Sequence, residues 1–360
     1  MLPDDNYIPA NSGFRTIEKV AKFVLILIYR CWRGCSAGIL SLILLYWMYG
    51  GVVIFLLLAS ALVGAFYHFQ DGLLYFPDQP ESSRFFVQSP HKLGIPFENS
   101  YIKSKDGIQI NILLLKQAER RLSVAPTLIY FHGNAGNIGH RLLNAHLVYT
   151  YSGCNVLLVE YRGYGRSEGS PSEKGLYSDA EAALEFLLKR DDIDHERIIL
   201  YGRSLGGAVA IDLATNQDYS EHIFALIIEN TFTSIPDIAC HMFPWIQKLP
   251  IVCYRNQFLS MEKIKMLLVP TLFISGLADQ LVPPAMMLDL YNASTAPMKR
   301  LETFVTGTHN DTWQCYGYSE VINKFLNEVV DARNAGLVTK PLRRTNQMHE
   351  SERKGMPKDI

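Results

Sequence analysis

Net charge, glycine repeats and long charged runs are the features that this sequence lacks. Its 34 basic and 35 acidic side chains leave a net charge of −1 over 360 residues, so no nucleic acid partner is expected. The 25 glycines and 17 prolines follow no period, which excludes a collagen-like chain. Hydrophobic residues make up 48% of the chain and aromatic residues 11%, which excludes a mainly disordered protein.

The cysteine and histidine spacings typical of metal sites are also missing. No C-x-x-C pair occurs, and His132 and His140 have no third candidate ligand near them, so neither a metal nor another cofactor is expected. The spacing of Cys240 and Cys253 fits a disulfide if the domain faces an oxidising compartment, and free buried thiols fit it equally well.

Charge is absent altogether from residues 34–70, a stretch of 37 residues. Within it, residues 39–66 exceed the roughly 20 apolar residues that a membrane-spanning helix needs. A buried core helix rarely lacks a polar face over such a length, and a signal peptide has a shorter apolar region nearer the N-terminus. A two-helix hairpin turning at Gly50 would leave a short first arm, so a single span over 37–66 is predicted, with the lipid bilayer as a partner.

The flanking charges predict the orientation of this span. Five basic residues precede it, whereas Arg84 alone follows within about 20 residues. The positive-inside rule then places the N-terminal segment, 1–36, in the cytosol and gives a single-pass type II protein whose larger domain is lumenal or extracellular. There, Asn292 and Asn310 would be glycosylation acceptors, because each begins an N-x-S/T sequon.

After a connector at 67–97, short apolar runs alternate with helical patterns. Seven such runs are strand-like, and they lie at 108–115, 127–131, 155–160, 197–201, 224–229, 271–275 and 300–305. Apolar residues at helical spacing recur at 176–188 and 321–329. This alternation predicts an α/β domain over 98–335 with a mostly parallel sheet, whose ligands bind at the carboxyl ends of the strands. Residues 336–360 are expected to form a disordered tail.

The strongest chemical pattern is Gly202-Arg-Ser-Leu-Gly206, which fits G-x-S-x-G between a strand-like and a helix-like segment. Such a turn exposes a serine hydroxyl above the edge of a sheet, so Ser204 is the predicted nucleophile. The alternative is a glycine-rich turn that only packs a helix against a strand. A phosphate-binding loop is excluded, because its G-x-x-x-x-G-K-[ST] pattern does not occur.

A serine nucleophile needs a base and an acid that orients the base. Asp279 and His309 follow successive strand-like runs, in the order serine, acid, histidine that this type of turn predicts. Glu229, at the end of another run, is the rival acid. For the oxyanion, the predicted backbone donors are Leu205, which follows the nucleophile, and either Gly133 or Asn134 in a glycine-rich loop. His132 is expected to orient that loop.

Together, the segments FHGNAGN, YRGYGRSEG, GRSLGG and THNDTW resemble the α/β-hydrolase superfamily, over roughly residues 66–330. The resemblance extends to members with one N-terminal membrane span. It implies that Ser204, Asp279 and His309 form the charge-relay triad and that Asn310 is glycosylated. It also implies serine hydrolase activity, which in some relatives removes palmitoyl groups from proteins.

The predicted function is therefore a membrane-anchored serine hydrolase for esters or thioesters, with a lipid or palmitoyl-type acyl group as one candidate substrate. A small cap at about 234–268, rich in aromatic residues and proline, would form a wall for an acyl chain or would be plain packing. Peptidase or amidase activity is the enzymatic alternative. A non-catalytic, membrane-anchored interaction module is the other, since a fold alone does not determine function.

Overall fold

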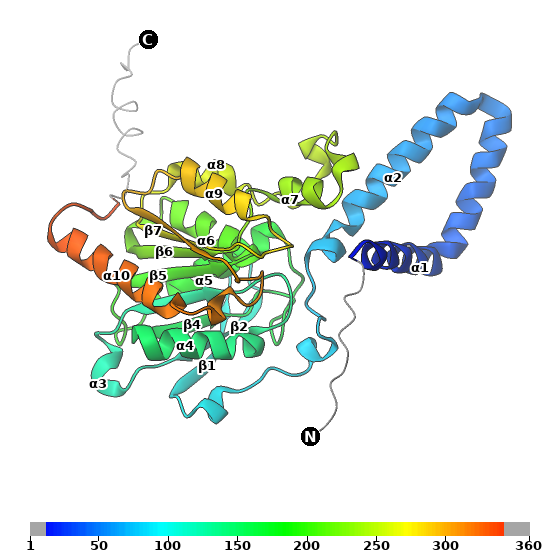
Figure 1. Cartoon of the computed structure of the whole chain (residues 1–360). Coiled ribbons are helices and arrows are strands. Elements are labelled where there is room, and N and C mark those ends of the chain that lie inside the picture. Colours follow the sequence, from blue (N-terminus) through cyan, green and yellow to red (C-terminus); the bar gives the residue numbers. More distant parts are fainter. Residues whose placement is uncertain (1–11, 342–360) are drawn as a thin grey trace, which may run out of the picture. The chain divides into compact units, whose positions relative to one another are not determined.

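The computed structural model describes residues 12–341 of the chain, which divide into two compact units. The first unit runs to His68 and the second begins at Phe69. The second unit contains the sheet and its covering helices (Figure 1). The strands are β1 (Phe97–Lys103), β2 (Gln109–Leu115), β3 (Thr127–Phe131), β4 (Asn155–Val159), β5 (Ile198–Arg203), β6 (Ile223–Glu229), β7 (Thr271–Gly276) and β8 (Lys299–Phe304).

The α-helices of the described chain alternate with these strands after the N-terminal pair. They are α1 (Ser12–Tyr49), α2 (Gly51–Leu74), α3 (Glu119–Leu122), α4 (Leu142–Ser152), α5 (Glu173–Leu188), α6 (Leu205–Thr215), α7 (Ile235–Met242), α8 (Ser260–Lys263), α9 (Pro284–Ala293) and α10 (Tyr318–Asn334). Short 3-10 helices, including Pro244–Ile246 and Ile251–Cys253, lie between α7 and α8.

The eight strands form one sheet in the order β1-β2-β4-β3-β5-β6-β7-β8. The pairs β1 with β2 and β2 with β4 are antiparallel, and the remaining pairs are parallel. This confirms the predicted mostly parallel α/β sheet, and all seven predicted strands are present within a few residues. The strand β1 was not predicted, because its sequence FENSYIK contains no apolar run and its residues are half-buried or exposed.

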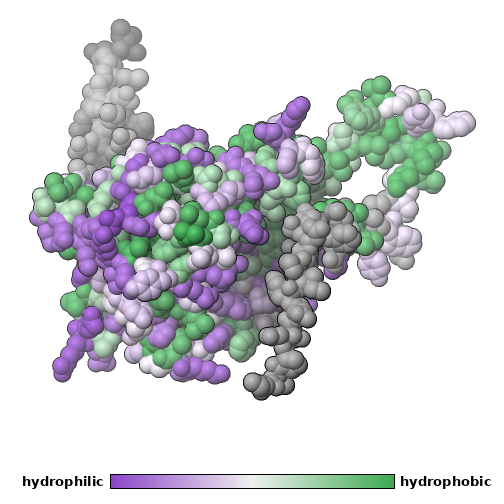
Figure 2. Space-filling model, in the orientation of Figure 1, coloured by the Kyte–Doolittle hydropathy of each residue, from purple (hydrophilic) through white to green (hydrophobic). Residues whose placement is uncertain are grey.

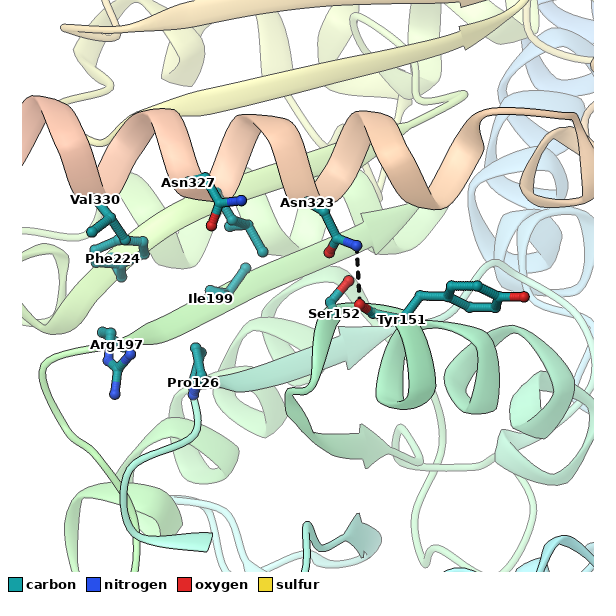
Figure 3. Close-up of a pocket in the computed structure, with 10 residues that line it drawn as sticks. Pro126, Tyr151, Ser152, Arg197, Ile199, Phe224, Asn323, Asn327 and Val330 are labelled. Atoms are coloured by element: carbon teal, nitrogen blue, oxygen red, sulfur yellow. Dashed lines mark hydrogen bonds between the residues drawn. The ribbon is translucent and has the colours of Figure 1, made fainter. Parts of the chain in front are cut away.

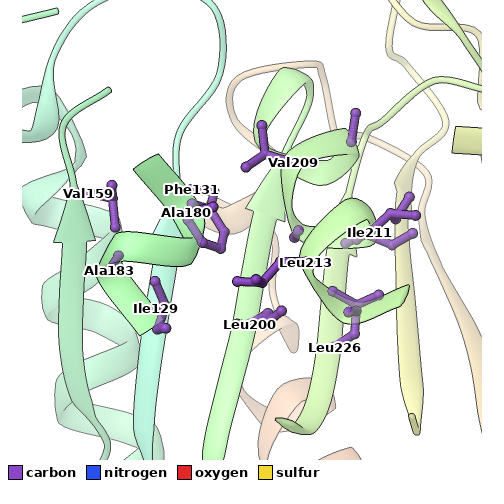
Figure 4. Close-up of a cluster of buried hydrophobic side chains, with 14 of the residues drawn as sticks. Ile129, Phe131, Val159, Ala180, Ala183, Leu200, Val209, Ile211, Leu213 and Leu226 are labelled. Atoms are coloured by element: carbon purple, nitrogen blue, oxygen red, sulfur yellow. The ribbon is translucent and has the colours of Figure 1, made fainter. Parts of the chain in front are cut away.

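Two hydrophobic clusters hold helices against the two faces of the sheet. On one face, α5 and α6 pack against alternate side chains of the central strands, including Ile129 and Leu200 (Figure 4). On the other face, α4 and α10 pack against the intervening side chains, such as Leu128 and Ile199. Central strands that are buried on both faces have continuous apolar sequences, which is why these strands were readily predicted.

The N-terminal apolar run differs from the predicted single helix over 37–66. It breaks at Gly50, whose φ of 77° lies in the left-handed region that glycine adopts at little cost. Among the described helices, only α2 is both long and apolar enough to cross a bilayer, and the apolar part of α1 is shorter. The candidate span therefore lies at Gly51–Leu74, and Figure 2 shows the hydrophobic residues gathered along it. The break falls where the alternative hairpin would turn.

Most of the predicted connector and the first residues of the predicted tail belong to the folded domain. Residues from Phe69 onward fall in the second unit, although α2 continues to Leu74. At the other end, Val338 is buried and its backbone N–H donates to the carbonyl of Ala332. The rest of the predicted tail, 342–360, lies outside the described residues, as do residues 1–11. The predicted cap corresponds to the insertion between β6 and β7, which contains α7 and α8.

A buried ion pair fastens the loop after β4 to α5. The Arg162 guanidinium lies 2.8 Å from the carboxylate of Asp179, which is fully buried, and it also pairs with the exposed Asp106. The Arg162 backbone N–H donates to the same Asp179 carboxylate over 2.8 Å. Loss of Asp179 would leave the Arg162 guanidinium, only 6% exposed, with the exposed Asp106 as its remaining charged partner, and removing one partner of a buried pair is costly.

We therefore predict that Asp179→Asn lowers the free energy of unfolding by about 3 kcal/mol. Asp192→Asn is the matched control, because Asp192 pairs with Arg190 but is 41% exposed, and its loss is expected to cost less than about 1 kcal/mol. Urea unfolding of the full chain in detergent, followed by circular dichroism, measures both. Equal shifts of the two midpoints would contradict the structural role of Asp179.

Candidate active site

Ser204 occupies the sharp turn between β5 and α6. Its φ of 55° and ψ of −121° are unusual for a residue with a side chain, and such strain is concentrated at functional sites. Hydrogen bonds on both sides hold this conformation: the Ser204 N–H donates to the carbonyl of Glu229, and the Thr231 hydroxyl donates to the carbonyl of Ser204. The conformation is thus imposed by β6 and the loop that follows it.

Two glycines allow the turn to be this tight. A Cβ on Gly202 would lie 2.1 Å from the carbonyl oxygen of Gly206, and a Cβ on Gly206 would lie 2.1 Å from the carbonyl oxygen of Phe131. Neither position has room for a side chain. The G-x-S-x-G spacing therefore reflects close contact of the turn with itself and with the end of β3.

The structure brings the three predicted triad residues together at the carboxyl ends of the strands. His309 Nε2 lies 3.0 Å from Ser204 Oγ, and His309 Nδ1 lies 2.7 Å from Asp279 Oδ2. The Asp279 side chain is almost fully buried, and that of His309 is 11% exposed. This geometry allows the imidazole to take a proton from the hydroxyl while the carboxylate holds the other ring nitrogen.

The orientation of the Asp279 carboxylate is set by its own loop. Its second oxygen, Oδ1, accepts hydrogen bonds from the backbone N–H groups of Leu281 and Val282, at 2.8 and 2.9 Å. One oxygen therefore faces the loop, and the other faces His309.

Glu229, the rival acid, points elsewhere. Its buried carboxylate accepts hydrogen bonds from the hydroxyls of Tyr201 and Tyr318 beneath the turn. Burial, together with the neighbouring Glu229 carboxylate, raises the pKa of both tyrosines well above the ordinary value, so both hydroxyls stay protonated and donate. The structure thus favours Asp279 as the partner of the histidine and gives Glu229 a place in the support under Ser204.

Asn230 and Arg203 were not predicted, yet they position the histidine loop. The Asn230 amide donates to the carbonyls of Thr308 and His309, and its oxygen accepts from the N–H of Gly276 at the end of β7. Arg203 Nη1 donates to the carbonyl of Asn310 over 3.0 Å. Asn230 therefore joins the loops that carry the acid and the base. Its φ of 46° lies in the left-handed region, which asparagine tolerates better than most residues, and no motif in the sequence marks this position.

The glycine-rich loop after β3 lies against the nucleophile. A Cβ on Gly133 would be 3.6 Å from the Cβ of Ser204. The Asn134 carbonyl accepts from the Phe76 N–H and the Tyr164 hydroxyl, both at 2.8 Å, and its side-chain amide donates to the carbonyl of Leu74. Residues just after the candidate span thus hold the backbone of the predicted oxyanion loop. Leu205 is the first residue of α6, where N–H groups have no partner within the helix.

His132 lies under this loop rather than in the site. It is fully buried, its Nδ1 lies 2.7 Å from the carbonyl oxygen of Gly133, and its Nε2 lies 3.4 Å from the Glu160 carboxylate. The Tyr161 hydroxyl donates to its backbone carbonyl. These contacts fit the expected role of His132 in orienting the loop.

Three further observations concern parts of the described chain other than the triad. A cavity of about 300 Å³, shown in Figure 3, is lined by Pro126, Ile199 and Phe224 near the amino ends of β3, β5 and β6. The triad residues lie at the other, carboxyl ends of the strands. Within residues 12–341, no group of three or more His, Cys, Asp or Glu side chains is placed to hold a metal ion. Cys240 and Cys253 both carry free thiols.

Comparison with known proteins identifies the class. Residues 126–250 match the family model described as the alpha/beta hydrolase fold. The chain is 41% identical over 271 residues to protein bem46 of Schizosaccharomyces pombe, covering 74% of this chain and 88% of that protein. It is 38% identical over 283 residues to the alpha/beta hydrolase domain-containing protein WAV2 of Arabidopsis thaliana, with 75% and 88% covered. The chain belongs to the α/β-hydrolase superfamily.

Two further matches bear on the fold and on the N-terminal region. A Saccharomyces cerevisiae protein described as the uncharacterized membrane protein YNL320W is 35% identical, over 78% of this chain and 95% of its own. The solved structure of the Pyrococcus furiosus esterase Pf2001 aligns with a TM-score of 0.56, covering 68% of this chain and 96% of that one. At 18% identity, this second likeness concerns the fold. Family and fold together support a hydrolase.

We predict that Asn230→Ala lowers kcat about tenfold to a hundredfold and leaves KM nearly unchanged, because the histidine loop loses its link to β7. Ester turnover with a soluble short-chain substrate measures both constants. Asn230→Asp keeps the acceptor oxygen and loses the amide donors, so its kcat is expected to be nearly as low as that of Asn230→Ala. The control is Asn216→Ala at the half-buried C-terminal end of α6, where the Asn216 side chain bonds Glu181 and the N–H of Asp218. A rise in KM with kcat unchanged would argue against a positioning role.

Proposed function

We propose that the protein is a membrane-anchored serine hydrolase that cleaves an ester or thioester bond. The observation that carries this proposal is the continuous arrangement from Ser204 Oγ through His309 to Asp279, at 3.0 and 2.7 Å, on a turn held in a strained conformation. A glycine-rich turn used only for packing has no need of a buried carboxylate and imidazole aligned on its serine.

In the proposed reaction, Ser204 Oγ attacks the acyl carbonyl while His309 Nε2 takes the hydroxyl proton. Asp279 stabilises the imidazolium through Nδ1. Backbone N–H groups of Leu205 and of Gly133 or Asn134 stabilise the oxyanion. The tetrahedral intermediate expels an alcohol or thiol, which receives the proton from His309. Water then attacks the acyl-enzyme, gives a proton to His309, and releases the acid as the proton returns to Ser204.

An ester or thioester is favoured over an amide by the family resemblance and by the esterase-like fold. The cap, with its aromatic residues, is suited to an acyl chain, which supports a lipid or palmitoyl-type substrate. Peptidase or amidase activity remains the enzymatic alternative. A non-catalytic interaction module would use the fold without the chemistry, and the alignment of all three triad residues weighs against it.

The anchor proposal now rests on α2, which has 24 residues and would extend about 36 Å, enough for a hydrocarbon core of about 30 Å. The basic residues that precede the apolar run favour a cytosolic N-terminus and a lumenal or extracellular catalytic domain. A substrate on the same side as the domain follows from this. S-acylated cytosolic proteins would lie on the opposite side of the membrane.

We predict that Ser204→Ala and His309→Ala each lower kcat for a short-chain ester by about 10⁴-fold or more, because each removes a group that acts as part of one unit. Labelling by a fluorophosphonate probe is expected to disappear in Ser204→Ala. Ser178→Ala, on α5, is the matched control and should keep both turnover and labelling. Wild-type turnover in both triad variants would exclude this site as the catalytic centre.

The orientation makes a separate prediction. Asn292 and Asn310 are both exposed, so a lumenal domain should carry glycans that an endoglycosidase removes. The variants Asn292→Gln and Asn310→Gln should each lose one glycan in a gel-mobility assay, and the double variant should lose both. Absence of any shift, with digestion of the domain by protease added to the cytosolic face of intact microsomes, would reverse the orientation.

A further inference from the structure

The cap carries an exposed apolar surface. Four large hydrophobic side chains, here called the cap patch, lie within eleven residues of sequence: Met242, Trp245, Ile251 and Val252, which are 50%, 81%, 50% and 76% exposed. Trp245 lies in the 3-10 helix Pro244–Ile246, and Ile251 and Val252 lie in Ile251–Cys253. Single exposed hydrophobic residues are common, but a cluster of this size marks an interaction surface.

The segment that carries the patch is hydrogen-bonded to the last turn of α2. The Gln70 side chain is buried, and its amide donates to the carbonyl of Cys253 over 2.6 Å while accepting from the N–H of Arg255 over 2.8 Å. Asp71 accepts from the Asn256 amide over 2.6 Å and pairs with Arg255 over 2.9 Å. All of these residues belong to the second unit.

These contacts occur where the charge-free stretch ends. Gln70 is its last residue, and Asp71 is the first charged residue after it. If α2 spans a bilayer, the membrane–water interface lies close to these two residues, because charged side chains leave the hydrocarbon core. Residues 253–256 are hydrogen-bonded to these two residues, so they and the neighbouring Ile251 and Val252 of the cap patch lie close to that interface.

The charges of the cap fit a lipid surface. No Asp or Glu occurs from residue 238 to residue 261, whereas Lys248 is present and exposed; Arg255 is exposed as well, but its charge is paired with Asp71. Basic side chains beside exposed apolar ones are typical of surfaces that bind phosphate headgroups and bury their apolar side chains in the interface. Tryptophan is the residue most suited to that depth, since its ring is apolar and its N–H is polar.

We propose that the cap patch inserts into the surface of the membrane that anchors the chain, so that the catalytic domain contacts the bilayer at a second place. This inference rests on the proposed anchor. The cap insertion begins just after Thr231, whose hydroxyl binds the Ser204 backbone, so a cap seated on the bilayer stays bonded at its first residues to the nucleophile turn. A membrane-resident ester or thioester is then the substrate class that reaches the site most directly.

Fluorescence of the full chain in phosphatidylcholine vesicles tests the proposal. In the first variant, Trp32, Trp47 and Trp313 are replaced by Phe, which leaves Trp245 as the only tryptophan of the original four. Two further variants, with all four replaced, report on other depths. Leu57→Trp reports on the apolar first half of α2. Leu337→Trp reports on an 80% exposed position just after α10. The end of α10 lies near the amino end of β6, because Arg333 donates to the carbonyl of Phe224.

We expect lipid brominated near the carbonyl region to quench Trp245 several-fold more than it quenches Leu337→Trp, and aqueous iodide to show the reverse order. Leu57→Trp should be quenched by lipid brominated deep in the acyl chain. Retention of fluorophosphonate labelling in each variant establishes that it is folded.

The other outcomes overturn the proposal in distinguishable ways. Quenching of Leu57→Trp with a Trp245 that behaves like Leu337→Trp would leave the anchor standing and reject insertion of the patch. Absence of bromolipid quenching in all three variants would reject the anchor and the insertion together. A Trp245 shielded from both quenchers only at high protein density would assign the patch to contact with a second copy of the chain.

Discussion

The close approach of the β5–α6 turn to the end of β3 is the constraint on which the site depends. Because Gly202 and Gly206 carry no side chains, the backbone of this turn touches itself and the Phe131 carbonyl. Ser204 is thereby held in a conformation that a free chain would avoid, with its carbonyl and N–H fixed from β6. The loops that carry Asp279, His309 and Gly133 meet at Ser204. The arrangement of the strands in the sheet therefore sets the positions of these loops around the serine.

Patterns that repeat locally could be predicted from the sequence. The central strands are buried on both faces and have continuous apolar sequences, and the triad residues follow strand ends in a characteristic order. The strand β1 could not be predicted, because it is an edge strand whose stability comes from pairing with β2. The break at Gly50 was weighed as the turn of a hairpin and rejected for the short first arm, because hydropathy does not distinguish a glycine inside a helix from one in the left-handed conformation.

The supporting contacts of the site were beyond sequence reasoning because they join residues far apart in the chain. Asn230 contacts His309 across 79 positions, and Asn134 contacts Leu74 across 60. No spacing rule relates such pairs. Asparagine suits position 230 because its amide donates and accepts at once, so one side chain satisfies backbone groups from two loops.

Residues 70–76 lie in or next to the segment that was predicted to be a connector, yet they are hydrogen-bonded to the folded domain. In a flexible connector, Gln70 would be exposed to water. Here its side chain is buried, and both its amide N–H group and its amide oxygen are hydrogen-bonded, which matters because a buried polar group without partners is costly. Here the same short segment binds the cap through Gln70 and the oxyanion loop through Leu74 and Phe76. The cap and the loop after β3 are therefore both hydrogen-bonded to the residues that end the apolar run.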